Sequence, residues 1–387
     1  MQADPITLDA SATEPDGAVS AERTTSPVEL LWDLVFVFAI TQVTTLLSSN
    51  LSWAGFGRSM LVLALVWWAW SAFVWASSAQ DPDAPLFRGL LFIAMVLIFL
   101  AGLALPRTFG SEATLFAVTY AGVRLLHLAL YADASRRGNA SLAAIAGFAL
   151  TVAVGMALLV VGSFAGGLAR ALLWASAAAI DYAGPGLLTR ERLRGLQQVA
   201  AAHFTERYSL FIIICLGESI VAVGLSASRR PLDAQLVAAV SFALLITIGL
   251  WWTYFDRFAA TAQARLREHR DPVLAASDAY SYLHLVLVAG IIIFAVGAKF
   301  SAAHVGSSLS QGARLALCGG VALYLAGHVA FRARLTGNIG YLKLGAAAAC
   351  LVLFAAGAGL PSWAIVASVS AVLAVLVVLE RAQPPTP

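Results

Sequence analysis

Residues 203–224 read HFTERYSLFIIICLGESIVAVG and place one carboxylate, Glu218, inside an apolar run long enough to cross a bilayer. A charged acid at the centre of a membrane helix costs roughly 2.5–3.5 kcal/mol unless it is protonated, paired or hydrated. Gly217 before it lets another backbone come close, and Ser219 after it can donate a hydrogen bond. The stretch therefore predicts a membrane helix that keeps a polar group at bilayer depth for a purpose.

The rest of the chain has the composition of an integral membrane protein. Of its 387 residues, 60% are hydrophobic and 12% are charged, whereas soluble globular proteins carry about 25% charged residues. The charges gather between apolar segments of about 20 residues, the length that crosses the hydrocarbon core as a helix. We therefore expect an all-α, polytopic integral membrane helix bundle whose first partner is the lipid bilayer.

Apolar segments along the chain indicate about 12 transmembrane helices. Two pairs of segments are joined by very short turns, so ten or eleven spans also fit. The segments are 29–49, 55–77, 87–105, 112–131, 141–162, 165–182, 207–226, 234–255, 277–298, 312–331, 341–359 and 361–379.

The spans group into two halves between polar ends. Residues 1–28 are a polar tail without the apolar core of a signal peptide, and 381–387 form a second tail. The halves are 29–182 and 207–380, and the apolar and basic residues of 183–206 predict an amphipathic linker between them. Lys and Arg are far more numerous in the loops on the side of the tails, so the positive-inside rule puts both termini in the cytoplasm.

Four features recur in the same order in the two halves, and they predict a 6+6 parallel internal repeat. Transporters built from such halves place their site at the interface between them, near the midplane. The matched features are an acid opening the first span (Glu29, Glu206), LVLALVWWAW against LITIGLWWTY (61–70, 245–254), an Asp-Pro pair (81–82, 271–272) and a histidine (His127, His328).

The first span carries three candidate residues. Glu29 and Asp33 are four residues apart and share one helix face, while Gln42 lies deeper. If Glu29 is aligned with Glu206, Thr41-Gln42 falls at the depth of Glu218-Ser219, so both halves bring hydrogen-bonding groups to one level. The alternatives are polar contacts that only hold helices together, and N-terminal capping by the two acids.

Two further groups of charged residues are candidates. Arg124 and His127 share a face of the fourth span, and Arg124 is deep enough to need a partner, for which Glu218 and Asp33 are the expected acids. His203, Glu206 and Arg207 stand together before the seventh span, where a solvated interfacial cluster is the plain alternative.

The aromatic residues and cysteines suggest structural roles. Four tryptophans near the end of the second span fit a belt at the membrane interface, and the three cysteines fit small apolar core positions. These residues are Trp67, Trp68, Trp70 and Trp75, and Cys215, Cys318 and Cys350.

No motif calls for a cofactor, a metal or a nucleic acid. The sequence has no Walker A, HExxH or CxxC pattern and no dinucleotide-binding glycine turn, and its histidines are dispersed. The net charge of +3 is too small to indicate a nucleic-acid partner.

Two stretches resemble the signature segments of the bacterial low temperature requirement A (LtrA) family. They are VELLWDLVFVFAITQVTTLL at 28–47 and the opening stretch, and the likeness continues through WWTYFD at 251–256 and YSYLHLVLVAGIIIFAVG at 280–297. The resemblance implies a multi-pass protein of the bacterial cytoplasmic (inner) membrane linked to growth in the cold, without a defined activity. By resemblance the matching positions are Glu29, Asp33, Gln42, His203, Glu206, Arg207, Gly217, Glu218 and Ser219.

The sequence favours a secondary transporter or permease-like protein over an enzyme. In this hypothesis Glu218 is a protonatable or substrate-binding group, Arg124 and His127 are counter-charges, and Gln42 and Ser219 are hydrogen-bond partners. One alternative is an intramembrane enzyme acting on a lipid or isoprenoid-like substrate with acids and His203 at the cytoplasmic interface. The other is a membrane sensor or structural protein of cold adaptation. The solute or lipid, the coupling ion and the oligomeric state stay open.

Overall fold

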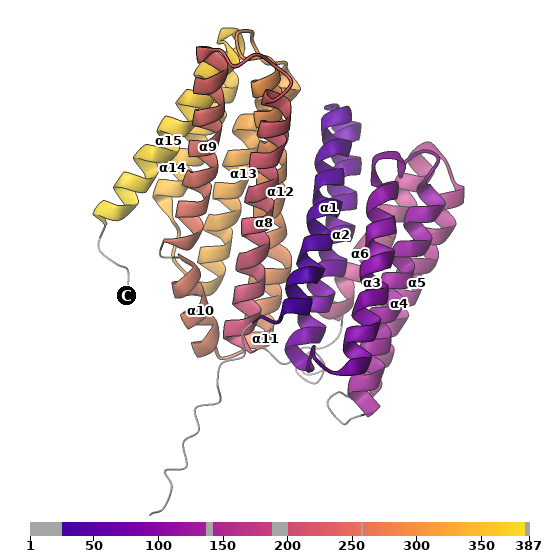
Figure 1. The fold of residues 1–387 in the computed structure, drawn as a ribbon. Helices are drawn as coiled ribbons and strands as arrows, with labels where there is room; N and C mark the ends of the chain where they lie inside the picture. Colours follow the sequence, from indigo (N-terminus) through magenta and orange to yellow (C-terminus); the bar gives the residue numbers. More distant parts are fainter. Residues whose placement is uncertain (1–24, 137–141, 188–199, 257, 384–387) are drawn as a thin grey trace, which may run out of the picture.

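The computed structural model describes residues 25–136, 142–187, 200–256 and 258–383, and this part of the chain is helical apart from short turns. Its long helices form two bundles that stand side by side (Figure 1). The first bundle consists of α1 (Pro27–Ser49), α2 (Trp53–Ala79), α3 (Pro85–Ala104), α4 (Ala113–Arg136), α5 (Leu142–Phe164) and α6 (Gly167–Leu187). The second consists of α8 (Ala201–Ala227), α9 (Ala234–Phe255), α12 (His284–Ala303), α13 (Gln311–Thr336), α14 (Tyr341–Ala356) and α15 (Ser362–Ala382).

Short helices complete the second bundle and the turns. They are α10 (Phe258–Glu268), α11 (Pro272–Ala276), the π-helix η2 (Ser277–Leu283) that runs into α12, and two single 3₁₀ turns, η1 (Leu105–Arg107) and η3 (Gly357–Gly359). We call the face at which α1 and α8 begin the lower face, as drawn in Figure 1, and the opposite face the upper face.

The predicted fold class is confirmed. Eleven helices of the described chain are long and apolar enough to cross a membrane, which makes the protein a multi-pass helical membrane protein. The predicted sixth span corresponds to α6, which is not among the eleven because Arg170 and Asp181 lower its mean hydropathy. α6 nevertheless follows α5 along its length, since Gly184 lies against Thr151 and Gly162 against Trp174.

The two bundles use the same order of helix neighbours. In each, the first helix packs on the second and third, the third on the fourth, the fourth on the fifth, the fifth on the sixth, and the second on the sixth. The internal repeat stays a prediction, and this shared order favours it. Of the predicted linker 183–206, residues 188–199 lie outside the described residues, and its two ends belong to α6 and α8. The tails lie outside them except at the first turn of α1 and the end of α15.

Glycines bring α12 and α13 into backbone contact. A Cβ at Gly290 would lie 2.6 Å from the Tyr324 nitrogen, and one at Gly320 would collide with the Phe294 nitrogen. In a bilayer, where apolar lipid removes most of the hydrophobic drive between helices, such close approach supplies the packing energy. The α12–α13 pair is therefore the tightly packed centre of the second bundle.

We expect Gly290→Ala to lower the free energy of unfolding by about 1–3 kcal/mol, because the added methyl overpacks the α12–α13 contact. Gly345→Ala is the matched control, since no atom lies within 4 Å of the place its Cβ would take. Thermal unfolding of the purified protein in detergent checks both variants. Equal melting temperatures for the two variants would contradict the packing argument.

Candidate functional site: the polar seam between the bundles

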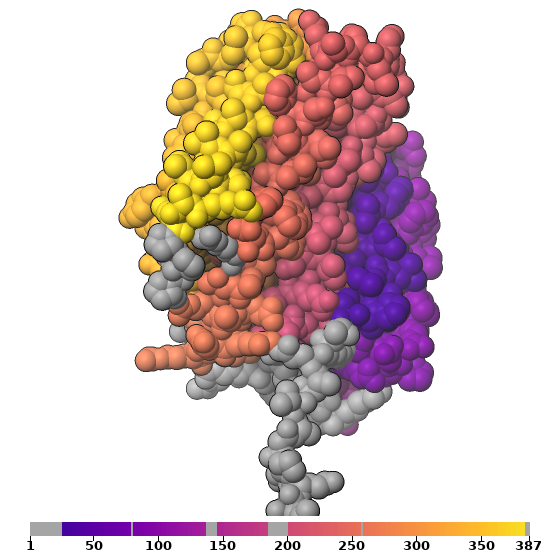
Figure 2. Space-filling view, turned by 60° about the vertical axis from the view of Figure 1, so that its left-hand side comes forward, coloured from indigo at the N-terminus to yellow at the C-terminus, as the bar shows by residue number. Residues whose placement is uncertain are grey.

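Buried polar groups concentrate where the two bundles meet. We call this contact the seam; it is formed by α1 and α2 of the first bundle and by α8, η2 and α12 of the second. Figure 2 shows α1 (indigo) beside α8 along the surface of the molecule. Polar residues on the α1 side of the seam recur about one turn or two apart, so they form a line from the lower face toward the upper face. The line contains Glu29, Asp33, Thr41 and Ser48.

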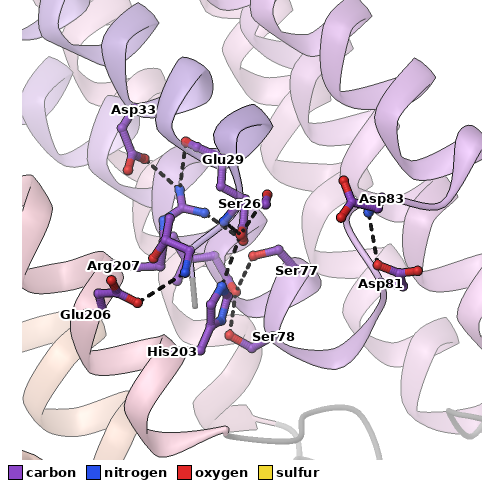
Figure 3. Close-up of polar contacts among 12 residues, drawn as sticks. Ser26, Glu29, Asp33, Ser77, Ser78, Asp81, Asp83, His203, Glu206 and Arg207 are labelled. Carbon is purple, nitrogen blue, oxygen red and sulfur yellow. Dashed lines mark hydrogen bonds and ion pairs between the residues drawn. The ribbon is translucent and has the colours of Figure 1, made fainter. Parts of the chain in front are cut away.

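At the lower end of the seam, Arg207 of α8 holds two carboxylates of α1 (Figure 3). Its Nη1 lies 2.7 Å from Glu29 Oε1, and its Nη2 lies 2.6 Å from Asp33 Oδ1. All three side chains are only 1–2% exposed. The planar guanidinium suits this arrangement, because its fork of N–H donors can address two carboxylates at once.

His203 and Ser26 complete the surroundings of Glu29. His203 Nε2 lies 3.1 Å from Glu29 Oε2, and the Ser26 backbone N–H donates to the same oxygen at 3.0 Å. The second contact is half of a capping box, so the predicted capping role of Glu29 and its ion pair with Arg207 coexist. Glu206 points elsewhere: it is exposed and accepts a hydrogen bond from the Thr25 backbone N–H.

The four clustered tryptophans of α2 are buried and do not form an interface belt, so that prediction was wrong. Trp67 and Trp70 are fully buried, Trp75 is 4% exposed and Trp68 is 6% exposed. The indole N–H groups of Trp67, Trp70 and Trp75 each have a partner across or along the seam. Trp70 donates to Asp33 Oδ1 at 2.8 Å, and the other two donate to Ser281. Tryptophans near the end of a span also fit a belt at the membrane interface. Here they are buried because the second bundle covers them.

Ser281 lies in the π-helix η2 and collects hydrogen bonds from α2. Trp67 Nε1 donates to the Ser281 carbonyl at 2.7 Å, and Trp75 Nε1 donates to its hydroxyl at 2.8 Å. The Ser71 and Tyr208 hydroxyls lie 2.6 Å apart and within 3.2 Å of the same serine hydroxyl. A π-turn frees backbone groups from the regular helical pattern, and the indole of Trp67 satisfies one of them.

Higher in the seam, Glu218 of α8 meets Thr41 of α1. Glu218 is 4% exposed, and its Oε2 lies 2.5 Å from the Thr41 hydroxyl. The same hydroxyl lies 3.0 Å from the Val37 carbonyl. The alignment of the two halves predicted that these groups share one depth, and the hydrogen bond shows that they do. No ion pair joins Lys299 of α12 to Glu218, although the structure describes both residues. The Lys299 Nζ donates instead to the Ser48 hydroxyl at 3.0 Å.

The other two predicted partners of Glu218 lie elsewhere. The Ser219 hydroxyl donates to the Leu216 carbonyl at 2.6 Å and lies 3.0 Å from the Thr247 hydroxyl, so it faces α9 inside the second bundle. Gln42 is half-buried and has no hydrogen bond within the described part of the chain. The prediction that Gln42 is a partner of Glu218 was wrong, because the neighbouring Thr41 is the residue that faces the seam.

The sequence suggested Glu218 or Asp33 as the partner of Arg124, and this prediction was wrong. Its Nη2 lies 2.6 Å from Asp181 Oδ1 of α6, and both side chains are fully buried. His127 Nδ1 lies 3.4 Å from Arg124 Nη1. Asp181 was not predicted as a partner. Its place in the sixth apolar segment was the available signal, because a buried arginine needs an acid nearby.

The described residues contain no group of three or more His, Cys, Asp or Glu side chains placed to hold a metal ion.

Comparison with known proteins identifies the group to which the sequence is similar. A family model described as bacterial low temperature requirement A protein (LtrA) matches residues 24–378. A curated protein of Rhizobium meliloti (strain 1021), named "Uncharacterized protein RA0937", is 31% identical over 309 residues, which cover 77% of this chain and 75% of that protein. No solved structure matches.

We expect Arg207→Met to lower the free energy of unfolding by about 3–5 kcal/mol, because it leaves two buried carboxylates without their cation. Adding Glu29→Gln and Asp33→Asn should recover much of that loss, since the neutral side chains no longer need the cation. Arg334→Met is the matched control: its ion pair with Asp278 is partly exposed, with side chains 31% and 39% accessible, and such pairs contribute about 0–1 kcal/mol. Thermal unfolding in detergent ranks the variants, and a triple variant no more stable than Arg207→Met would refute the assignment.

Proposed function

The chain belongs to the bacterial low temperature requirement A (LtrA) family, and we propose that it works as a secondary transporter whose coupling group is Glu218. It is a multi-pass membrane protein. In this proposal the lower face is cytoplasmic and the membrane is the bacterial inner membrane, as the distribution of Lys and Arg favours.

One observation carries the proposal: Glu218 is the buried carboxylate that has no cation within ion-pair distance among the described residues. Glu29 and Asp33 are held by Arg207, and Asp181 is held by Arg124. Glu218 has a hydroxyl partner instead. An acid at bilayer depth is stable without a cation when it carries a proton, and it must gain another partner when it loses that proton.

The contact between Glu218 and Thr41 suits both protonation states. The hydroxyl of Thr41 can donate to an ionised Glu218, or accept from a protonated one while it donates to the Val37 carbonyl at 3.0 Å. No heavy atom has to move between the two patterns. A group that exchanges a proton in a low-dielectric site benefits from a partner of this kind.

The position of Glu218 supports a coupling role. Its contact joins the first helices of the two bundles, so a relative movement of the bundles would make or break it. Below it, the Arg207 ion pairs close the seam. Toward the upper face, Lys299 of α12 donates to Ser48 of α1, and an apolar groove of about 700 Å³ is lined by residues of both bundles. Transporters built from two repeated halves place their site at the interface between the halves, as Glu218 is placed here.

The alternative of an interfacial lipid enzyme receives less support. That hypothesis used Glu29 and Asp33 as acid–base groups, but each is 1% exposed and bound to Arg207. A group that exchanges protons with a substrate must come within hydrogen-bond reach of it. These carboxylates are occupied as parts of the contact between the bundles.

We expect Glu218→Gln to abolish proton movement into proteoliposomes under an imposed substrate or pH gradient, because glutamine keeps the hydrogen bond but cannot release a proton. Glu206→Gln is the matched control, since Glu206 is on the same helix and exposed. The assay is a pH-sensitive dye enclosed in the vesicles. Wild-type flux in Glu218→Gln would sink the coupling role, and a lower melting temperature with no flux change would assign Glu218 to bundle packing.

A further inference from the structure

A second polar site lies between α2, α4, α5 and η2. It is a cavity of about 30 Å³ at the seam, so residues of both bundles line it. It is separate from the Glu218 contact and shares no residue with it. The polar lining residues used below are Trp68, Ser71, Arg124, His127 and Ser281.

Three buried nitrogens of the lining have no partner among the described residues. They are Nε of Arg124, Nε1 of Trp68 and Nε2 of His127, and these residues are 0%, 6% and 1% exposed. Buried donors without partners are rare in native proteins. The cavity beside these residues is the place where an acceptor would satisfy the donors.

The charge around the cavity is already balanced. Asp181 lies 2.6 Å from Arg124 Nη2 and neutralises the guanidinium. Because arginine can only donate, the 3.4 Å contact of Arg124 Nη1 with His127 Nδ1 makes that ring nitrogen an acceptor. A bound anion would therefore add a charge with no counter-charge, at a high desolvation cost.

The hydroxyls of the lining add donors and acceptors without charge. Ser71 and Ser281 lie 3.2 Å apart, and both also contact the Tyr208 hydroxyl. A hydroxyl can rotate to donate or accept as the occupant requires. The volume matches about two water-sized groups, since one water needs at least about 10–15 Å³.

We propose that this cavity is a binding site for a small, neutral hydrogen-bond acceptor, either water or the carbonyl or hydroxyl end of a polar solute. Arg124 and Trp68 donate to it, and the serine hydroxyls complete its shell. The assignment does not depend on the coupling role of Glu218. It also accounts for the depth of Arg124: the Asp181 ion pair fixes a guanidinium that lines the cavity and whose Nε has no partner among the described residues.

Hydroxyl-radical footprinting of the full chain in nanodiscs tests the site, because buried side chains next to bound water are labelled while dry ones are not. We expect Trp68 to be labelled several-fold faster than Trp174, which is fully buried and whose indole N–H donates to the Leu159 carbonyl at 2.9 Å. Ala72 lines the cavity, so Ala72→Leu should fill it and lower the labelling of Trp68 alone. A melting curve of that variant confirms that it is folded.

Formamide and formate, at equal concentration and close in size, identify the class of ligand. If the site binds a neutral polar solute, formamide should protect Trp68 from labelling and formate should not. Protection by neither assigns the site to water, which also satisfies the proposal. Protection by formate equal to or greater than that by formamide would overturn it, and so would labelling of Trp68 no faster than that of Trp174.

Discussion

The ion pairs of Arg207 are the interaction on which the contact between the bundles depends. A carboxylate inside a membrane protein is tolerated only with a partner, and α1 carries two of them one turn apart. One guanidinium from α8 pairs with both carboxylates. This contact fixes the rotation of α1 about its axis and the position of α8 along the membrane normal. The remaining seam contacts follow from that register: Trp70 reaches Asp33, and Thr41 comes level with Glu218.

Most of the fold could be predicted from hydrophobicity, because helix length and apolar composition are dictated by the bilayer. Ten of the twelve long helices start within two residues of their apolar segments, whereas α8 starts six residues earlier and α12 seven residues later. Glu218 stood out by residue type alone. The pairing of Arg124 with Asp181 could not be predicted, since several buried acids satisfy an arginine equally well and only tertiary packing selects one. The π-helix at 277–283 was equally hidden, because its hydrophobic pattern does not differ from that of an α-helix. The misplaced tryptophan belt has the same cause, as its surroundings are supplied by the other bundle.

The buried polar groups differ in how they are paired. Arg207 at the seam and Arg124 within the first bundle hold their acids at ion-pair distance, and such contacts resist separation because each broken pair leaves a buried charge. Glu218 and the hydroxyls around Ser281 have hydrogen-bond partners and no ion pair, and such contacts can be exchanged for water. The ion pairs thus hold the helices in register, and the groups for which we propose proton exchange or ligand binding are held by hydrogen bonds alone.

The ion pairs at the lower end of the seam also constrain how the protein is made. Glu29 and Arg207 are 178 residues apart in the chain, so the ribosome has produced the whole first bundle before α8 emerges. During that interval α1 holds two carboxylates without their arginine, in a segment that must already begin to enter the bilayer. Its lower turn gains its counter-charge only when α8 arrives, so complete insertion of the first helix is coupled to synthesis of the seventh span.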